Sequence, residues 1–205
     1  MKSEVVVGPG SASDGSLVGL RGGRAGEAIV SELHGRYYEQ AVRGNLFMAS
    51  AIVTAPVIYT TAAGTGGPII WNGSSNKNVV LLAAGVGITV VTTVAAALGI
   101  TGNTGQPSAP TSTTAADSRG NLLIGGDAAA ATPYRVGTPV NAGGCFLPFM
   151  DAHTGALTVD TGVMRWVDLG GAIVCPPNGW VSIAASATAT TLVATLALVW
   201  EEVPI

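Results

Sequence analysis

The stretch that decides the fold is PPNGWVSIAASATATTLVATLALVWEEVPI, at residues 176–205. It opens on the turn signal Pro-Pro-Asn-Gly at 176–179. Apolar and small polar residues then alternate over 181–188, as they do along a strand with two different faces. The apolar phase shifts at 189–191 before a second apolar run at 192–200. Because side chains in a strand repeat every two residues, this shift predicts a tight hairpin or a bulge.

Strand signals recur through most of the chain. LFMASAIVTAPVIYTTA at 46–62 is apolar and β-branched, and Pro56 predicts either an edge strand or a break between two short strands. Six short segments follow between 121 and 175: NLLIGG, TPYRVG, GCFLPFM, ALTVD, GVMRWVDL and AIVC. The stretch 101–120 is low in apolar residues, which predicts a long surface loop. Many short strands with frequent turns favour an antiparallel β-sandwich around one core.

Charge divides the chain into two parts. Of the 205 residues, 48% are hydrophobic and only 10% are charged, against about 25% in ordinary soluble domains. Ten of the 21 charged residues lie within 1–45, and Lys77 is the only one from Gly44 to Ala116. This division predicts a polar N-terminal arm over 1–45 and a charge-poor β-sandwich domain over 46–205. Such a surface, covered by Thr, Ser, Asn and Gly, is typical of a protein that packs against neighbours.

The arm has a helical pattern, because apolar residues recur every three to four positions over 27–42. Gly35 interrupts the pattern, so a bent helix and an extended arm both stay open. The arm supplies aromatic rings and guanidinium groups, which are enriched at interface hot spots. The alternative is the solvated side of an ordinary helix. The candidate interface residues are Arg36, Tyr37, Tyr38 and Arg43, together with Trp200 in the last strand.

Several classes of protein do not fit this sequence. A net charge of −3 gives no basic patch for nucleic acid. The apolar stretches 79–100 and 181–200 are long enough to span a membrane, but they are rich in Gly, Thr and β-branched residues and lack flanking Lys or Arg clusters. The first residues have no secretory apolar run. We therefore expect a protein made without export, with Cys145 and Cys175 as two buried thiols rather than a bridge.

The chemical motifs are weak. Asp160-Thr161-Gly162 matches the tripeptide of aspartic proteases, but a single copy needs a symmetric dimer, and the same residues are ordinary turn chemistry. Asp151 and His153 supply only two metal ligands. Asn72-Gly73-Ser74 matches a glycosylation sequon, which without export is only a turn. No phosphate-binding loop is present in the sequence. We therefore predict no catalytic, cofactor or metal site, and no enzyme.

The chain resembles a family of small virion structural proteins of tailed bacteriophages. The resemblance lies in GRYYEQAVRGNLF at 35–47, NKNVVLLAAGVGI at 76–88 and the stretch 176–205. Its ending, a Gly-aromatic strand, a hairpin and a closing Trp-Glu-Glu strand, is similar to the end of jelly-roll modules that assemble as trimers. The resemblance implies a structural role and no catalytic motif.

What we expect from the resemblance is a jelly-roll β-sandwich that forms a homotrimer. We expect a capsid decoration or cement protein whose arm binds the major capsid protein or another virion protein, in virions assembled in the host cytoplasm. A tail or fibre protein is the alternative within this class. Outside the class of virion proteins, the alternative is a carbohydrate-binding module, in which the four tryptophans at 71, 166, 180 and 200 could form a sugar-binding platform. Their strand context favours packing in the core or at an interface instead.

Overall fold

The computed structural model of the chain describes residues 36–60, 66–90, 92, 94, 96–151, 164–188 and 191–205. The chain divides into two units, Met1–Glu39 and Gln40–Ile205. Of the first unit only residues 36–39 are described, and there the guanidinium carbon of Arg36 lies 5.1 Å from the centre of the Tyr37 ring. Helix α1 (Tyr38–Val42) covers the end of the predicted helical pattern, and the earlier part of that pattern lies outside the described residues.

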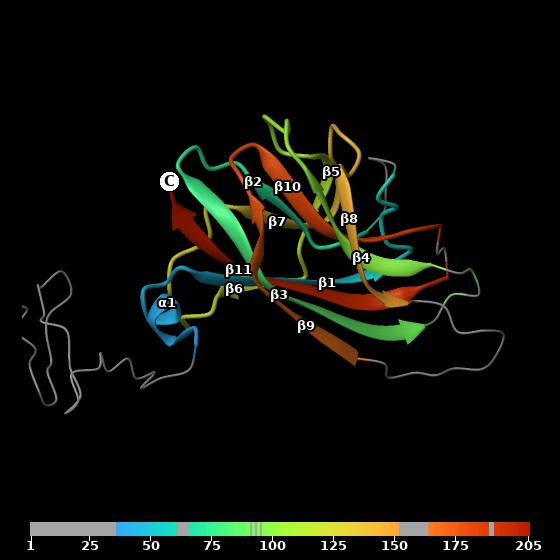
Figure 1. Cartoon of the computed structure of the whole chain (residues 1–205), viewed down its shortest axis with the longest axis horizontal. Helices are drawn as coiled ribbons and strands as arrows, with labels where there is room; N and C mark the ends of the chain where they lie inside the picture. Colours follow the sequence, from blue (N-terminus) through green and yellow to red (C-terminus); the bar gives the residue numbers. More distant parts are fainter. Residues whose placement is uncertain are drawn as a thin grey trace, which may run out of the picture. The chain divides into compact units, whose positions relative to one another are not determined.

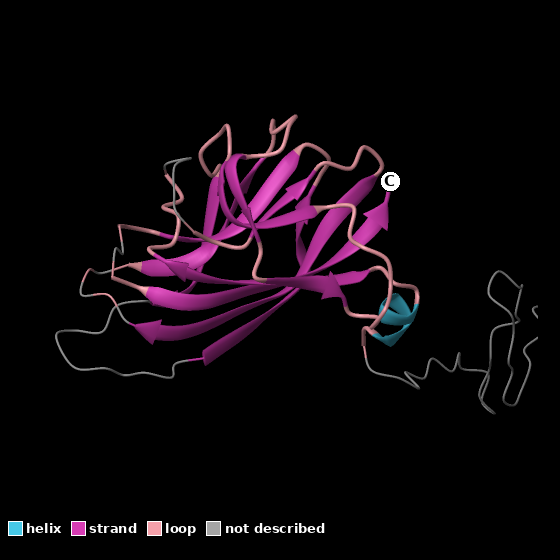
Figure 2. Ribbon diagram, turned by 180° about the vertical axis from the view of Figure 1, so that it is seen from behind, coloured by secondary structure: helices cyan, strands magenta, loops and turns pink. Residues whose placement is uncertain are grey.

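The second unit is an antiparallel β-sandwich, which confirms the predicted fold class (Figures 1 and 2). Within the described ranges, the order of the five-stranded sheet is β6-β1-β11-β3-β9, and that of the six-stranded sheet is β5-β7-β2-β10-β4-β8. The strands are β1 (Leu46–Thr54), β2 (Ile69–Asn72), β3 (Lys77–Val90), β4 (Ala97–Asn103), β5 (Thr111–Ala115), β6 (Ser118–Asn121), β7 (Thr132–Thr138), β8 (Cys145–Asp151), β9 (Met164–Cys175), β10 (Gly179–Ala185) and β11 (Val193–Pro204).

The strand pairing is nested, and this makes the sandwich a jelly roll. β1 pairs with β11, β2 with β10, β3 with β9 and β4 with β8, all antiparallel. The eight strands therefore behave as one long hairpin rolled up into two sheets, the arrangement of the jelly-roll class. β5, β6 and β7 are inserted between β4 and β8, and they extend the edges of the two sheets next to β1 and β2.

The core lies between the two sheets and follows the alternation of the strands. On β1 the residues Phe47, Ala49, Ala51 and Val53 are buried, and on β11 the same holds for Ala194, Leu196, Leu198 and Trp200. Trp200 is 1% exposed, and its ring stacks on Phe47 at 5.9 Å between centroids. The interface role predicted for Trp200 is thus wrong for this chain, because its phase along β11 turns the indole inward rather than to the surface.

The last thirty residues need a different explanation from a hairpin. β10 and β11 do not pair with each other but lie in different sheets, so the phase shift marks the crossing from one sheet to the other. Residues 189 and 190 lie outside the described part of the chain. β10 is also buried on both faces, including Ser182 and Ala184, where the alternation predicts one polar, solvated face.

Two further predictions on strands are corrected. The stretch 101–120 is not one long loop, because it holds the end of β4, all of β5 and most of β6. β5 and β6 lie at the sheet edges with mostly exposed side chains, so these strands need few apolar residues. The predicted strand NLLIGG is a turn beyond Asn121, whose Oδ1 accepts a hydrogen bond from the Leu123 backbone N–H at 2.8 Å.

β1 ends at Thr54 and Ala55 has a φ of 56°, so the first of the two strands predicted around Pro56 ends before the proline. The second does not form among the described residues, where Ile58 makes only an isolated β-bridge with Ala185. The two predicted strands GVMRWVDL and AIVC join into β9. At Gly170 and Gly171, with φ of 56° and 83°, β9 bulges: Leu81 on β3 faces Ile173, and Ala83 faces Asp168. The predicted strand ALTVD lies outside the described residues.

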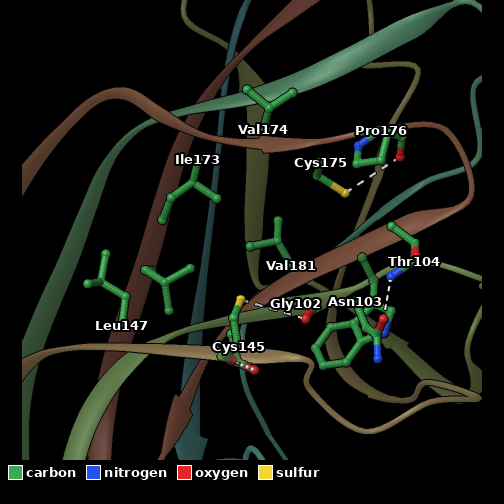
Figure 3. Close-up of a pocket in the computed structure, with 13 residues that line it drawn as sticks. Gly102, Asn103, Thr104, Cys145, Leu147, Ile173, Val174, Cys175, Pro176 and Val181 are labelled. Carbon is green, nitrogen blue, oxygen red and sulfur yellow. Dashed lines mark hydrogen bonds between the residues drawn. The ribbon is translucent and has the colours of Figure 1, made fainter.

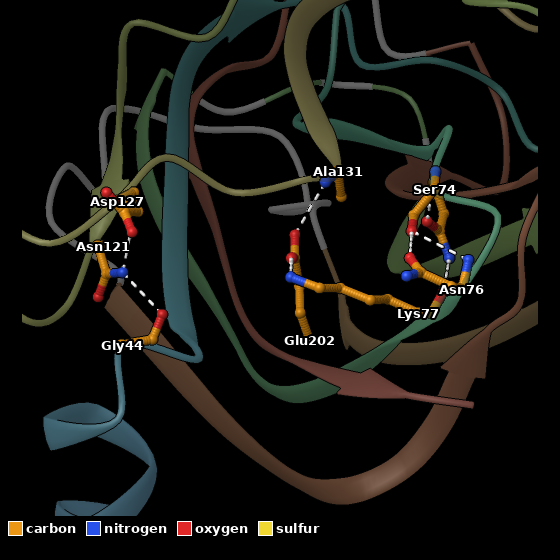
Figure 4. Close-up of polar contacts among 9 residues, drawn as sticks. Gly44, Ser74, Asn76, Lys77, Asn121, Asp127, Ala131 and Glu202 are labelled. Atoms are coloured by element: carbon orange, nitrogen blue, oxygen red, sulfur yellow. Dashed lines mark hydrogen bonds and ion pairs between the residues drawn. The ribbon is translucent and has the colours of Figure 1, made fainter.

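One carboxylate is buried in the sandwich. Glu202 on β11 is 1% exposed, and its Oε2 lies 3.0 Å from Lys77 Nζ (Figure 4). Its Oε1 accepts a hydrogen bond from the Ala131 backbone N–H at 2.8 Å. Both oxygens of the buried charge are therefore paired, which a buried carboxylate requires. This contact fastens the end of the loop before β7 to the centre of the five-stranded sheet.

Candidate assembly interface

The outer face of the five-stranded sheet presents three rows of residues across β1, β11, β3 and β9. The pairing between strands fixes these rows, because residues directly opposite each other point to the same side of a sheet. The first row is Ile52, Thr195, Gly87 and Met164; the second is Ser50, Ala197, Gly85 and Trp166; the third is Met48, Val199, Ala83 and Asp168. We call these twelve residues the outer platform.

The outer platform is apolar and nearly uncharged. Asp168, at one end of the third row, is its only charged residue. Small residues fill the middle on β11 and β3, and larger apolar side chains stand at both sides. Met164 is 84% exposed, Trp166 61% and Ile52 59%. Large exposed apolar side chains gathered on one face of a sheet mark an interaction surface, whereas single ones scattered over a surface do not.

Trp166 packs against a glycine of the neighbouring strand. A Cβ atom added to Gly85 would lie 2.8 Å from Cε3 of Trp166 and 2.9 Å from Cζ3, so the indole rests directly on the backbone of β3. A side chain at position 85 would push the ring off the sheet. Trp166 thus lies against β3 at Gly85 and still leaves much of its aromatic surface open to solvent.

The two edges of this sheet are finished differently. At one edge, β6 is short, and beyond it the carboxylate of Asp117 accepts a hydrogen bond from the Ile52 backbone N–H at 2.6 Å. Asp117 also pairs with Arg135 at 3.1 Å. At the other edge lies β9, with no further strand beside it in the described part of the chain. Charges protect an edge from unwanted pairing, so Asp117 protects β1 where β6 does not reach, whereas β9 has no such group in the described part of its pairing and stays open to a neighbour.

An apolar cavity of about 270 Å³ opens between the sheets near β8 and β9 (Figure 3). Ile100, Leu147, Ile173 and Val181 are among its walls, and both cysteines line it. Both thiols are free, but Cys145 is exposed, so only one of the two predicted buried thiols is buried. Burial raises the pKa of the Cys175 thiol to about 12, which keeps it protonated and unreactive at neutral pH.

The predicted interface residues of the arm lie at the start of the described chain. Arg36 and Tyr37 contact each other as described above, and Tyr38 is 47% exposed at the start of α1. Arg43 is exposed in the turn after this helix. The residues of the outer platform were not among the predicted sites. The signal that could have found them is the run of Ala, Gly and Thr at alternate positions of β3 and β11, which mirrors the inward-facing apolar residues.

The four tryptophans do not form a common platform. Trp200 lies in the core and Trp180 is 2% exposed in the six-stranded sheet, where it pairs with Trp71 across β10 and β2. Asp160, Thr161, Gly162 and His153 lie outside the described residues, as does the side chain of Asp151.

Within the described ranges, no three His, Cys, Asp or Glu side chains gather as metal ligands. Nor does any helix in that part of the chain have the length and apolarity to cross a membrane. Compared with protein-family models, with curated proteins and with solved structures, the chain has no match.

Proposed function

We propose that this chain is a structural protein of a bacteriophage virion, a capsid decoration or cement protein that associates with copies of itself through the outer platform. The observation that carries the proposal is the nearly uncharged platform with Trp166, Met164 and Ile52 exposed on it. The jelly roll is a fold of viral capsid proteins and also of lectins, so the fold supports the proposal by analogy only. The resemblance in 35–47, 76–88 and 176–205 points the same way.

The platform suits association on physical grounds. Burying an ion costs several kcal/mol unless it is paired, and the first two rows hold no ion. Removing apolar surface from water contributes about 25 cal/mol per Å², and stable interfaces bury about 1,200–2,000 Å² in total. Trp166 and Met164 are the large side chains that anchor such interfaces, while small residues let two sheets approach closely. In this proposal the protein acts by burying apolar surface against its neighbours and catalyses no reaction.

Light scattering during size exclusion tests the oligomer. We expect a trimer at micromolar concentration, and Ala197→Glu, which places a charge in the middle row, should convert it into a folded monomer. Thr111→Glu on β5 is the matched control, because it adds the same charge to an exposed position on the other sheet. A wild-type monomer, or an oligomer that tolerates Ala197→Glu as well as it tolerates Thr111→Glu, contradicts self-association through the platform.

The arm is tested separately. In this proposal residues 1–45 fasten the protein to the major capsid protein or to another virion protein, while the β-domain forms the oligomer. A protein lacking residues 1–44 should therefore stay a folded oligomer and fail to join capsids in a sedimentation assay. Loss of folding in this shortened protein, or normal joining to capsids, counts against an arm with this role. A tail or fibre location is distinguished by labelling the protein on particles.

A carbohydrate-binding module is a second candidate, and Trp166 is the observation that favours it. Its ring lies against Gly85 and the residue is 61% exposed, so its aromatic surface is accessible to a sugar. A glycan array with the wild type and Trp166→Ala tests this function. Binding of a glycan that Trp166→Ala abolishes would favour the module over the virion role.

A further inference from the structure

Three consecutive apolar residues lie in the turn after β6, and all three are exposed. They are Leu122, Leu123 and Ile124, and we call them the apolar tip. Ile124 is 94% exposed, so no described part of the chain covers it. Single exposed apolar side chains are ordinary, but a run of three exposed ones in a turn indicates a surface that something else covers.

Hydrogen bonds hold the apolar tip in one conformation. Oδ1 of Asn121 accepts from the Leu123 backbone N–H at 2.8 Å. Nδ2 of the same side chain donates to the carbonyl oxygens of Gly44 at 2.8 Å and Asp127 at 3.1 Å (Figure 4). The Gly126 backbone N–H donates to the Leu123 carbonyl oxygen at 2.8 Å. Because the tip is preorganised, binding through it loses little conformational entropy.

The apolar cavity of about 270 Å³ has the size and the chemistry to receive this tip (Figure 3). Leu147 on β8 and Val174 on β9 line the cavity and are half exposed, so it opens to solvent between the edge strands of the two sheets. None of the described residues that line it is charged. A cavity of about 150 Å³ holds a benzene molecule, so this one has room for the four-carbon side chain of Ile124.

The apolar tip and the cavity lie at the two ends of one row of paired residues across the five-stranded sheet. In order from β6 to β9, the row consists of Asn121, Phe47, Trp200, Leu81 and Ile173. Asn121 directly precedes the tip, and Ile173 is a wall of the cavity. The two features therefore lie at opposite edges of the sheet and at the same level along its strands.

We propose that the apolar tip of one copy inserts Ile124 into the cavity of the next copy, and that this contact closes the copies into a ring. A second copy is the occupant because the chain itself carries the matching apolar tip. The contact joins two different patches, and heterologous contacts form rings when the rotation between copies closes. Neither patch holds a charge, so no ion is desolvated.

This inference rests on the proposed self-association and adds the pair of surfaces that gives it a direction. Both surfaces lie at sheet edges, so the contact leaves the outer platform available within the same ring. A branched side chain inserted into a pocket is the kind of anchor that contributes most of the binding energy of an interface.

Cysteine cross-linking of the full chain tests the contact, because the cavity already carries an exposed thiol, that of Cys145. Ile124→Cys should form a disulfide with Cys145 of the next copy when diamide takes up the two thiol hydrogens. In a heterologous ring each copy makes two such bonds, so covalent trimers should appear on a non-reducing gel. A contact between equivalent patches stops at dimers.

Two controls accompany the cross-linking. Adding Cys145→Ser to Ile124→Cys should abolish the trimers, and Thr111→Cys, at an exposed position on the edge strand β5 of the other sheet, should give none. Cys175 does not compete, because it is buried. If Ile124→Cys gives no covalent trimers, or if they persist without Cys145, the ring is wrong.

Light scattering measures how much the apolar tip contributes. Ile124→Asp should raise the dissociation constant of the oligomer at least about tenfold, because it places a charge in an apolar cavity. Val140→Asp, the same change at an apolar residue that is 63% exposed, should leave the dissociation constant unchanged. Circular dichroism checks that both variants are folded.

The two proposals fail in different ways. An oligomer that Ala197→Glu dissociates and Ile124→Asp does not overturns the insertion of the tip alone. A wild-type monomer overturns it together with the proposed self-association.

Discussion

The outward-facing surfaces of the two sheets have similar residues and opposite surroundings. On the six-stranded sheet, Trp180, Ser182 and Ala184 of β10 point away from the core and are nevertheless 2% exposed or less. On the five-stranded sheet, the outer platform has the same mixture of small and aromatic residues, yet Trp166 is 61% exposed. Both faces are charge-poor, so composition does not separate them.

The difference is made by the loops. Gln106 is fully buried against the six-stranded sheet, where its backbone O accepts from Trp71 Nε1 at 2.9 Å and its Oε1 accepts from the Val140 N–H at 2.6 Å. Tyr59 stacks on Phe146 at 4.6 Å between ring centroids. Among the described residues, the chain's own loops cover the six-stranded sheet but not the outer platform. An apolar face that the chain does not cover itself is the one available to a neighbour.

The largest effect is expected from a glutamate placed on the covered face. Ala184→Glu forces an unpaired charge into a site that is 0% exposed, which should cost about 3–5 kcal/mol and unfold much of the protein. Ala197→Glu, the same change on the bare face, should alter stability by less than about 1 kcal/mol. Chemical denaturation of both variants, performed under conditions where the wild type is dissociated, measures this. If both variants lose the same free energy of unfolding, the two faces do not differ in burial as described.

A pair of glycines tests the same comparison at a smaller scale. A Cβ at Gly67 would lie 2.8 Å from Ser182 Oγ and 2.9 Å from the Ile183 carbonyl oxygen, so Gly67→Ala should cost about 1–3 kcal/mol. At Gly85 the added atom meets only the Trp166 ring and the Ala197 methyl group, and the ring can swing into solvent. Gly85→Ala should therefore cost less than about 1 kcal/mol but weaken self-association, as thermal unfolding and light scattering would report.

The smallest effect concerns Glu201, which lies on the bare side of β11 just beyond the third row. Burial raises the pKa of its carboxyl above the ordinary 4.5, so the folded state disfavours the ionised form. The resulting loss of stability exists above the raised pKa and disappears as the pH falls through it.

Glu201→Gln should therefore stabilise the protein near about pH 7 and have no effect near about pH 4. The gain stays below about 0.5 kcal/mol, because solvent screens a largely exposed group. Thermal unfolding across this pH range measures it. A neighbour bound on the outer platform would bury Glu201 further and increase the stability gain of Glu201→Gln. If this gain has the same size in the monomer and in the oligomer, the neighbour does not cover the platform next to its third row.

The sandwich was predictable because its central strands keep a period of two. β1 and β11 alternate buried and exposed residues over most of their length, and Pro56 marks the end of β1 as a proline should. The edge strands β5 and β6 were not predictable in this way, since their described side chains are mostly exposed and carry no apolar pattern. The sheet to which each strand belongs depends on contacts far apart in sequence, which local alternation does not contain.

The sites were predicted less well, and Trp200 shows why. The same indole is suited to an interface or to a core, and only its phase relative to Phe47 decides between them. Ser182 and Ala184 gave the opposite error, because a polar or small residue on a strand signals solvent unless a distant loop covers it. The outer platform, spread over four strands, became visible only once the register of those strands was known.

The nested pairing has a consequence for how the protein is made. Among the described strands β1 is synthesised first and its partner β11 last, and β11 also separates β1 from β3 in the finished sheet. Until Val193–Pro204 has been synthesised, the five-stranded sheet lacks its middle, and the apolar sides of β1 and β3 have nothing to close on. Pairings so distant in sequence are slow to form. Folding of the jelly roll is thereby postponed until β11 has been synthesised, and during that interval the apolar sides of β1 and β3 are exposed to association with other chains.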